Sequence, residues 1–336
     1  MRKLALLLLL AGFASTALAA TRVSVGQVEQ LLAASHNLPD AKLAGKISGL
    51  ELVERASSAR LARWQNDFSG KRTREALLVL ADASSFLDLP PAEILPKASP
   101  DSAAQSAIFQ RAVVYADTTI KKLPNFSARR STTHFDDVSP MQRLRSQSMV
   151  DPSRGIQASY AQTAPAPSPL LRYGDPSSFV VTYRDGEEVA DTQTEKGKKT
   201  APPAIGLSTY GEFGPILSVA TGDAMHGKVF WSHWEQGATG PLAVFRFLVH
   251  QEDSHFTVLG AGNMSRCPSY HGEMAVDPAT GTILRVTLAS DWKPPFQPSE
   301  SAIAVEYGPV QIGNATYTCP IKGVALSKMP NAGEAG

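Results

Sequence analysis

The chain has little of several residue types, and each shortage argues against a class of protein. Only two of its 336 residues are cysteines, too few for a cysteine-rich zinc module or a small disulfide-dense scaffold. Its 32 Lys and Arg nearly balance its 31 Asp and Glu, so the formal net charge is +1. A dedicated nucleic-acid-binding protein neutralises phosphates with a basic surface, and this composition argues against such a partner.

Long apolar runs and known catalytic motifs are also absent beyond the N-terminus. No later segment offers the roughly 20 apolar residues of a membrane-spanning helix, so we predict no transmembrane span there. The sequence contains no HExxH, GxSxG, Walker or GxGxxG motif. The motifs therefore assign no catalytic residue, no metal and no cofactor, and they give no indication of a metalloprotease, serine hydrolase or nucleotide enzyme.

The N-terminal 20 residues have the three parts of a secretory signal peptide. Residues 2–3 are Arg-Lys, residues 4–13 form an apolar run, and residues 17–19 are Ala-Leu-Ala, a small-residue cleavage pattern. The apolar run is short for a membrane anchor. We predict cleavage beside Ala19 or Ala20 and export of the mature chain, either to the periplasm or out of the cell.

Export changes the interpretation of the two cysteines. Cys267 and Cys319 would mature in an oxidising compartment, where disulfides persist. We predict a disulfide between them, which would close a long loop and contribute about 4 kcal/mol on the chain-entropy model. The alternative is a pair of free, buried thiols.

Residues 21–122 have a helical pattern. Ser24 and Gln27 fit a capping box ahead of apolar residues at helical spacing. Asp40 is placed to cap a short second helix, and Ser99 is placed to cap a helix over roughly 100–122. We predict that apolar stripes on these helices form ordinary core.

The pattern changes to strands from Pro124 onward. Roughly ten apolar or alternating runs follow, and Asp185-Gly186 and the stretch 277–281 are hairpin signals between two pairs of them. No helix-length segment separates the late strands, so sequential antiparallel pairing is expected. The predicted fold class is α+β, with a curved, mainly antiparallel meander sheet that resembles an open half-barrel.

The predicted organisation has four segments. The signal peptide covers 1–20 and the helical region covers 21–122. The antiparallel β domain covers 123–328, with loops near 139–175 and 192–206 that we expect to be mobile because they are rich in Pro, Ser, Gly and charge. Residues 329–336 are predicted to be a flexible tail.

Histidines and carboxylates are the remaining candidates for chemistry. Five of the seven histidines fall between residues 226 and 271: His226, His233, His250, His255 and His271. Carboxylates adjoin His250 and His255 in "HQEDSH". Such a group either holds a metal ion or consists of scattered surface residues. His250 and His255 differ by an odd number, so on one regular strand they would face opposite sides. The second interpretation is therefore favoured.

Glu212 is the most distinctive carboxylate because "YGEFG" places glycines on both sides of it. It fits either a tight helix start, with its charge near the positive end of the dipole, or a loop that contacts a ligand. A glycan or peptide hydrolase would need Glu212 and a second carboxylate. The other candidates for that pair are Glu187, Glu188, Glu252, Asp253, Glu273 and Asp277.

Several stretches resemble a family of secreted bacterial proteins of acidobacterial type, among them "SGLELVERASSARLARW" (48–64), "KKLPNFSARRSTTHFDD" (121–137) and "YHGEMAVDPATGTILRV" (270–286). This resemblance implies export and no particular activity or catalytic residue. The helix that runs into "LPNFSARRSTTHF", followed by a meander with "DPATGTILRV", is similar to the periplasmic lipoprotein-carrier superfamily. That resemblance implies an open half-barrel whose concave apolar face is covered by helices and holds acyl chains.

The predicted function follows from the sheet and its covering helix. Small residues such as Ala104 and Ala112 on the helix over 100–122 would leave room above a curved apolar sheet. We therefore predict an exported, non-catalytic binding protein with a groove for an apolar small molecule or lipid. The alternatives are an interaction scaffold for an envelope protein, in which helix and sheet pack tightly, and a hydrolase that uses Glu212.

Overall fold

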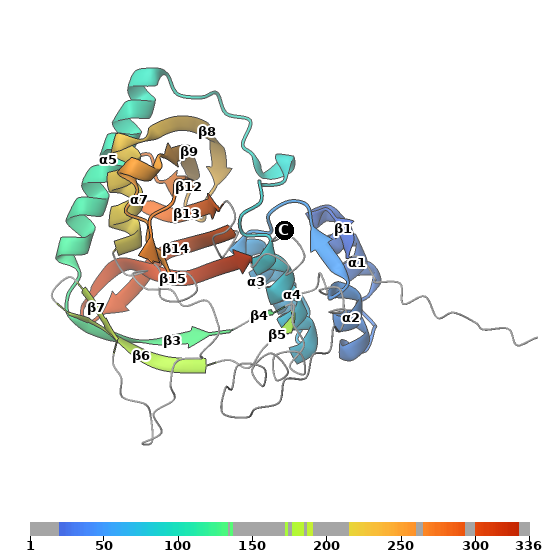
Figure 1. The fold of residues 1–336 in the computed structure, drawn as a ribbon. Coiled ribbons are helices and arrows are strands. Elements are labelled where there is room, and N and C mark those ends of the chain that lie inside the picture. Colours follow the sequence, from blue (N-terminus) through green and yellow to red (C-terminus); the bar gives the residue numbers. More distant parts are fainter. Residues whose placement is uncertain are drawn as a thin grey trace, which may run out of the picture.

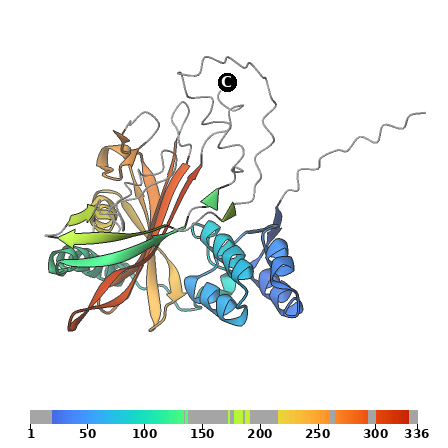
Figure 2. The same ribbon diagram turned by 90° about the horizontal axis from the view of Figure 1, so that it is seen from below.

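The computed structural model describes most of the chain beyond the predicted signal peptide. The described residues are 20–133, 135–136, 172–173, 177–184, 187–190, 215–259, 265–292 and 300–328. Helices dominate the N-terminal part and an antiparallel sheet dominates the rest, which confirms the α+β class (Figures 1 and 2). No described helix is long and apolar enough to cross a membrane.

The N-terminal part forms a helical unit with its own core. Its elements are β1 (Thr21–Val23), α1 (Val25–Ala34), α2 (Asp40–Ile47), β2 (Leu50–Leu52), α3 (Ser58–Asp67), α4 (Lys71–Ala83) and the 3-10 turn η1 (Pro91–Glu93). The core is built within residues 25–81 and includes Val28, Leu43, Ile47 and Leu77, each at most 2% exposed. The parallel pairing of β1 with β2 inside this unit was not predicted.

Helix capping explains two of these helix starts. The predicted capping box is present: Ser24 N–H donates to Gln27 Oε1 at 2.8 Å, and Gln27 N–H donates to Ser24 Oγ at 3.2 Å. The prediction that Asp40 caps α2 is wrong: Asp40 is the first residue of that helix and follows Pro39. Its carboxylate instead accepts the Thr73 N–H at 2.9 Å and so caps α4.

The second part is a six-stranded antiparallel sheet with strand order β15-β14-β13-β12-β9-β8. The strands are β8 (Lys228–Gln236), β9 (Pro241–Val249), β12 (Tyr270–Val276), β13 (Ile283–Asp291), β14 (Glu300–Ile312) and β15 (Ala315–Lys328). Neighbours in the sheet follow one another along the chain, apart from β10 (Val258–Leu259) and β11 (Ser265–Arg266), which form a separate pair. The predicted meander is therefore confirmed.

Turn chemistry fixes the register of this meander. Gly281, with φ +77°, donates its N–H to Asp277 O at 2.9 Å, so the predicted hairpin turn at 277–281 is confirmed.

The smaller sheet β3-β6-β7 contains β3 (Phe126–Thr132), β6 (Ser177–Arg184) and β7 (Glu187–Ala190). Arg184 pairs with Glu187, as the Asp185-Gly186 signal predicts. The pair β4 (Phe135–Asp136) and β5 (Arg172–Tyr173) and the turn η2 (Gln251–Asp253) complete the described strands and 3-10 turns.

Two helices cover the concave face of the main sheet: α5 (Ser102–Lys122) and α7 (Pro215–His226) (Figures 1 and 2). Ala104 N–H donates to the Asp101 side chain at 2.8 Å, so the cap of α5 lies at Asp101 and not at Ser99. Helix α7 begins at Pro215, shortly after Glu212, where a helix start was one of two alternatives, but its extent to His226 was not predicted. The helical unit lies on the opposite side of the sheet, so the described molecule has three layers (Figure 2).

The predicted disulfide is wrong, because both cysteines are free. Cys267 lies three residues before β12, whereas Cys319 is on β15, and β13 and β14 separate these two strands. Neighbouring strands are about 4.8 Å apart, so three steps place the two residues roughly 14 Å apart across the sheet. A disulfide needs Cα atoms within about 7 Å.

Most residues of the predicted loops at 139–175 and 192–206, and of the tail at 329–336, lie outside the described residues. Within the first loop only Arg172 and Tyr173 are described, and they form β5.

Candidate functional site

The structure separates the five candidate histidines. Among the described residues, no group of three or more His, Cys, Asp or Glu could hold a metal ion. His233 lies beside Glu235, with 3.9 Å between His233 Nε2 and Glu235 Oε2, whereas His255 contacts Asp223 on α7. His233 and His255 therefore lie in two different polar environments, one on β8 and one beside α7.

The candidate carboxylates are dispersed as well. Glu212 lies outside the described residues, and so do both of its neighbouring glycines. The remaining candidates lie on separate elements: Glu187 and Glu188 on β7, Glu252 and Asp253 in η2, Glu273 on β12, and Asp277 in the turn after β12. Among the candidates whose side chains are described, Glu273 is the one that enters a buried cluster of charges.

That cluster lies between the helical unit and the outer face of the sheet, and we call it the junction cluster: Arg55, Glu235, Arg246, Glu273 and Arg285. Arg285 holds Glu235 with two hydrogen bonds, Nη1 to Oε1 at 2.5 Å and Nη2 to Oε2 at 2.9 Å. Arg55 from the helical unit donates to the same Oε2 at 2.9 Å. Glu273 accepts from Arg246 Nε at 3.0 Å and from Arg285 Nη2 at 3.5 Å.

Burial makes the balance of charge in this cluster important. The side chains of Arg55, Glu235 and Arg285 are 6%, 12% and 11% exposed. Burial alone would raise the pKa of Glu235, but the His233 imidazole and the charges of Arg285 and Arg55 outweigh it and hold that pKa well below its usual range. Glu235 is therefore ionised and bridges two guanidinium groups.

A second set of polar contacts joins the same two layers nearer to β14 and β15. Lys322 Nζ lies 2.7 Å from Asp82 Oδ1, and Ser58 Oγ donates to Glu306 Oε1 at 2.7 Å. Arg246 also contacts Asp88 of the helical unit. These contacts carry no reactive arrangement, and they fix the helical unit against the sheet.

The most chemically suggestive group is Asp223 with His255 and Tyr270. Asp223 is 2% exposed, and its carboxylate contacts His255 Nδ1 at 2.7 Å and accepts the His255 backbone N–H and the Tyr270 hydroxyl, each at 2.8 Å. The His255 side chain is 76% exposed. Its hydrogen bond to Asp223 and the Asp223 charge raise the pKa of His255.

A buried carboxylate that orients an exposed imidazole is one half of an acid–base site. A hydrolytic triad also needs a nucleophile hydrogen-bonded to that imidazole. Within the described part of the chain, no hydroxyl or thiol fills this position; the nearby Thr257 hydroxyl instead contacts Cys267 Sγ at 3.6 Å. The group therefore ties α7 to the segment that leads into β10.

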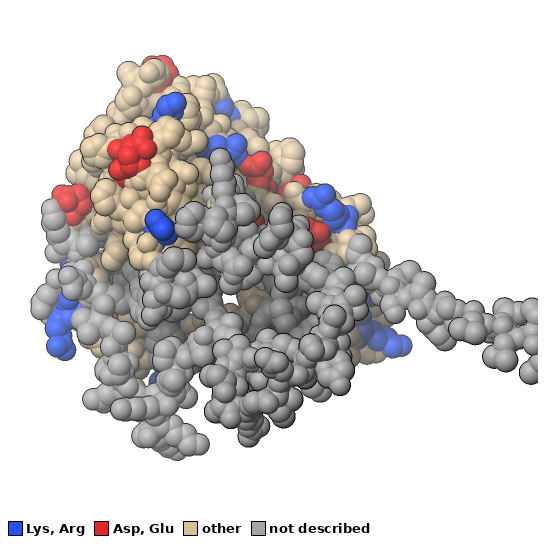
Figure 3. All heavy atoms as spheres, viewed as in Figure 1, with Lys and Arg blue, Asp and Glu red and all other residues tan. Residues whose placement is uncertain are grey.

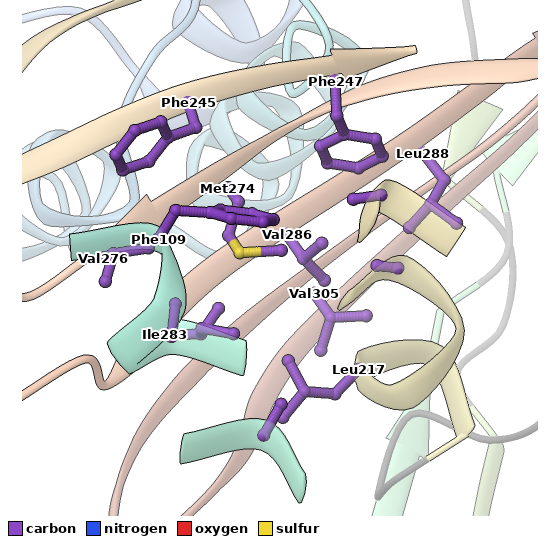
Figure 4. Packing of buried hydrophobic residues seen from close by; sticks show 14 of the residues in the cluster. Phe109, Leu217, Phe245, Phe247, Met274, Val276, Ile283, Val286, Leu288 and Val305 are labelled. Carbon is purple, nitrogen blue, oxygen red and sulfur yellow. The ribbon is translucent and has the colours of Figure 1, made fainter. Parts of the chain in front are cut away.

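The concave face of the sheet is a packed core. Ile108, Phe109, Ala112 and Ala116 of α5 are at most 9% exposed, and they lie in one cluster with residues of α7 and the sheet. Figure 4 shows Phe109 and Leu217 facing Met274, Val286 and Val305 across this space. An acyl chain could enter here only if α5 moved away from the sheet.

The outer face carries exposed apolar side chains where β8 forms the edge. Phe230 and Leu248 are 54% and 40% exposed, whereas Phe245 and Phe247, which point to the concave side, are each 2% exposed. The register pairs Lys228 with Leu248 and Phe230 with Arg246, so Phe230 and Leu248 are diagonal neighbours on one face. We call Lys228, Phe230 and Leu248 the edge patch.

One end of the β8 edge is already covered by another segment of the chain. Leu95 N–H donates to Trp234 O at 2.9 Å, and Ile94 forms an antiparallel bridge with Glu235. The Trp234 indole N–H donates to Ala98 O at 2.9 Å. In the described part of the chain, no backbone hydrogen bond joins residues 228–232 to any segment other than β9.

On the face shown in Figure 3, the described charges do not single out a further site. In the view of Figure 3, described cations and acids are interspersed, and neither sign gathers into one large patch. This distribution is consistent with the near-zero net charge of the sequence.

Sequence reasoning missed Arg55, Glu235 and Asp223, although one signal was available. Arg285 and Glu306 are charged residues inside apolar strands, and they pair directly across β13 and β14. Charged residues at such positions indicate buried polar contacts: Arg285 contacts Glu235 and Glu273, and Glu306 accepts a hydrogen bond from Ser58. No comparable local signal marks Arg55, whose partner Glu235 is 180 residues away.

No family model, curated protein or solved structure matches this chain.

Proposed function

We propose that the mature chain is an exported, non-catalytic interaction protein that binds an envelope protein through the outer face of its sheet. The observation that carries this proposal is the edge patch, where Phe230 and Leu248 are exposed side by side. Exposed apolar side chains that occur singly are normal, but adjacent ones beside a strand edge favour protein contact.

The filled concave face supports the same proposal. Because α5 and α7 occupy the space above the sheet, the described structure leaves the outer face as the place for a partner. The contacts of Arg55 and Lys322 hold the helical unit on that face and leave the edge patch uncovered by described residues. Burial of the exposed half of Phe230 would remove roughly 100 Å² from water, which corresponds to about 2.5 kcal/mol.

Site-specific crosslinking tests this proposal in the native host. A photoreactive phenylalanine analogue replaces Phe230 in the full-length chain, and the matched control carries it in place of Val114, which is 60% exposed on α5. We expect one envelope protein to be crosslinked from position 230 and not from position 114. That protein, once purified, should bind the mature chain, and Phe230→Asp should weaken the binding. Identical adducts from both positions would remove the basis of the proposal.

Export is part of the proposal and has its own test. The signal-like N-terminus predicts that the soluble protein recovered from the native host begins at Ala20 or Thr21. Intact-mass measurement decides this, and a soluble product that retains Met1 would contradict it.

Acyl-chain binding is a second candidate, because α5 is held on the sheet by apolar contact of the kind that an acyl chain could also make. Ile108, Phe109, Ala112 and Ala116 together contribute about 6 kcal/mol of apolar burial at the usual transfer values, and the partly buried Val113 and Tyr115 add to it. A chain of about 14 methylene groups contributes about 11 kcal/mol when fully buried, so it could replace α5 on the sheet.

Titration of the delipidated mature chain with a fluorescent fatty acid tests this second candidate. Ile108→Trp should alter probe uptake because Ile108 is on the side of α5 that faces the sheet, whereas Val114→Trp, on the exposed side of α5, should not. No detectable binding at micromolar probe, together with no effect of Ile108→Trp, would leave the surface interaction as the remaining proposal.

A further inference from the structure

We infer that residues 228–232 of β8 bind an extended peptide segment of the partner protein, which adds to the sheet as an antiparallel strand. This inference rests on the proposed function, because it specifies how the envelope partner would be recognised. Strand addition supplies affinity through backbone hydrogen bonds and specificity through alternate side chains.

The chain itself already uses this edge for strand addition. Ile94 forms an antiparallel bridge with Glu235, and Leu95 N–H bonds to Trp234 O, directly next to residues 228–232, which pair with no described segment other than β9. The pairing stops at Pro96, which is the central residue of a tight turn between Leu95 and Lys97. The Lys97 N–H then bonds to Leu95 O at 2.7 Å, which turns the chain away from β8.

Both faces of residues 228–232 offer contacts for alternate side chains of an added strand. Phe230 projects from the outer face, and Leu248 lies diagonally behind it on β9. On the concave side, Val229 and Trp231 are only partly buried against the core. Trp231 packs edge-on to Phe245, with 5.6 Å between ring centroids, so an added strand would contact a packed apolar surface on the concave side.

The charge at this edge selects the chemistry of the peptide. Lys228 is exposed at the beginning of β8, next to the apolar residues. Arg246, opposite Phe230, is already held by Glu273 and Asp88. The favoured occupant is therefore an extended segment with alternating apolar residues and an acidic residue at its end near Lys228.

Three synthetic peptides test the inference on the full mature chain. The first, acetyl-EVTVTVE-amide, has the expected chemistry; the second, acetyl-EVTPTVE-amide, lacks a central backbone donor; the third, acetyl-KVTVTVK-amide, reverses the charge. Fluorescence anisotropy with labelled peptides should show binding of the first and at least about tenfold weaker binding of the other two. Hydrogen exchange should show new amide protection within residues 228–232 when the first peptide is bound.

Matched variants assign the effect to this edge. Phe230→Asp should weaken binding of the first peptide by about fivefold or more, because it removes apolar contact and adds a repulsive charge. Val114→Asp, an equally exposed change on α5, should leave the affinity unchanged. Circular dichroism checks that both variants are folded, and the exchange measurement on the unchanged chain does not depend on either of them.

Several results would overturn the inference. These are no binding at millimolar peptide, equal affinity of the proline peptide, equal affinity of Phe230→Asp, or protection outside residues 228–232. Self-association of the chain that Phe230→Asp abolishes would assign the edge to a second copy instead. If crosslinking at position 230 captures a partner that binds without protecting 228–232, strand addition fails but the proposed interaction function stands.

Discussion

Replacement of Glu235 by alanine tests the energetic role of the junction cluster. The change removes the carboxylate that bridges Arg55 and Arg285, whose side chains are only 6% and 11% exposed. Two guanidinium groups would then face each other with Glu273 as their nearest anion, at 3.7 Å and 3.5 Å. Removal of one partner from a buried ion pair costs about 3–5 kcal/mol, a large share of the 5–15 kcal/mol that stabilises a typical domain.

Urea unfolding followed by tryptophan fluorescence measures this loss, since Trp234 adjoins Glu235. The matched control is Glu75→Ala on α4, whose partner Lys71 is 88% exposed at 3.9 Å; this change should cost less than about 0.5 kcal/mol. Glu235→Gln, which removes the charge and keeps an acceptor, should fall between the two. A loss below about 1 kcal/mol for Glu235→Ala would refute the assignment of Glu235 as the bridge.

The pH dependence supplies an independent arm of the same test. The pKa of Glu235 in the folded chain lies below that of an unfolded glutamate, which is about 4.3. Its contribution is therefore complete well above pH 4.3 and is lost as the pH falls through the folded-state pKa. The stability difference between the unchanged chain and Glu235→Gln should be constant near neutral pH and should shrink below about pH 4. A difference that grows with acidification would contradict this sign.

Three further predictions concern single sites. Asp223 raises the pKa of His255, so an NMR titration should place that pKa above 6.5, and Asp223→Asn should lower it. The contact stabilises the folded chain fully below the unfolded-state pKa of His255, and this contribution is lost as the pH rises through the raised folded-state pKa. Cys267 should react with a thiol reagent in the native chain, whereas Cys319, whose burial raises its pKa, should react only after unfolding. If the unfolded, unreduced chain has no titratable thiol, the two cysteines form a disulfide and the prediction is wrong. Gly281→Ala should destabilise the chain by at least about 1 kcal/mol in thermal unfolding, because φ is +77° and a Cβ would lie 2.5 Å from the α5 backbone; an unchanged melting temperature would contradict this.

Local signals in the sequence predicted local structure well. Ser24 and Gln27 form the capping box that their spacing indicates, and the turn at 277–281 joins the two strands on either side of it. These features depend on hydrogen bonds between residues that are close in the chain. The meander followed because short turns leave consecutive strands adjacent.

A helix start near Glu212 was only one of two alternatives, and the extent of α7 was missed for a physical reason. Its sequence, PILSVATGDAMH, contains β-branched residues and Gly222, which lower helix propensity. Ile216, Leu217, Ala220 and Ala224 are buried in the core shared with α5 and the sheet, so packing overrides that weak local preference.

The candidate site depended on contacts that only the register establishes. Arg55 meets Glu235 across 180 residues, and Asp223 meets Tyr270 across 47. The disulfide prediction failed on the same ground, because two cysteines in the stranded part can belong to strands that never touch.

The separate core of the helical unit has a consequence for the order of folding. Its core residues all fall within residues 25–81, so this unit can gain its contacts before the sheet has been synthesised. Arg55 must then remain hydrated until Glu235 and Arg285 are in place, and the docking of the two layers becomes a late, desolvating step. Since opposite charges steer that encounter, its rate should fall as ionic strength rises, whereas collapse of the helical unit alone should be indifferent to salt.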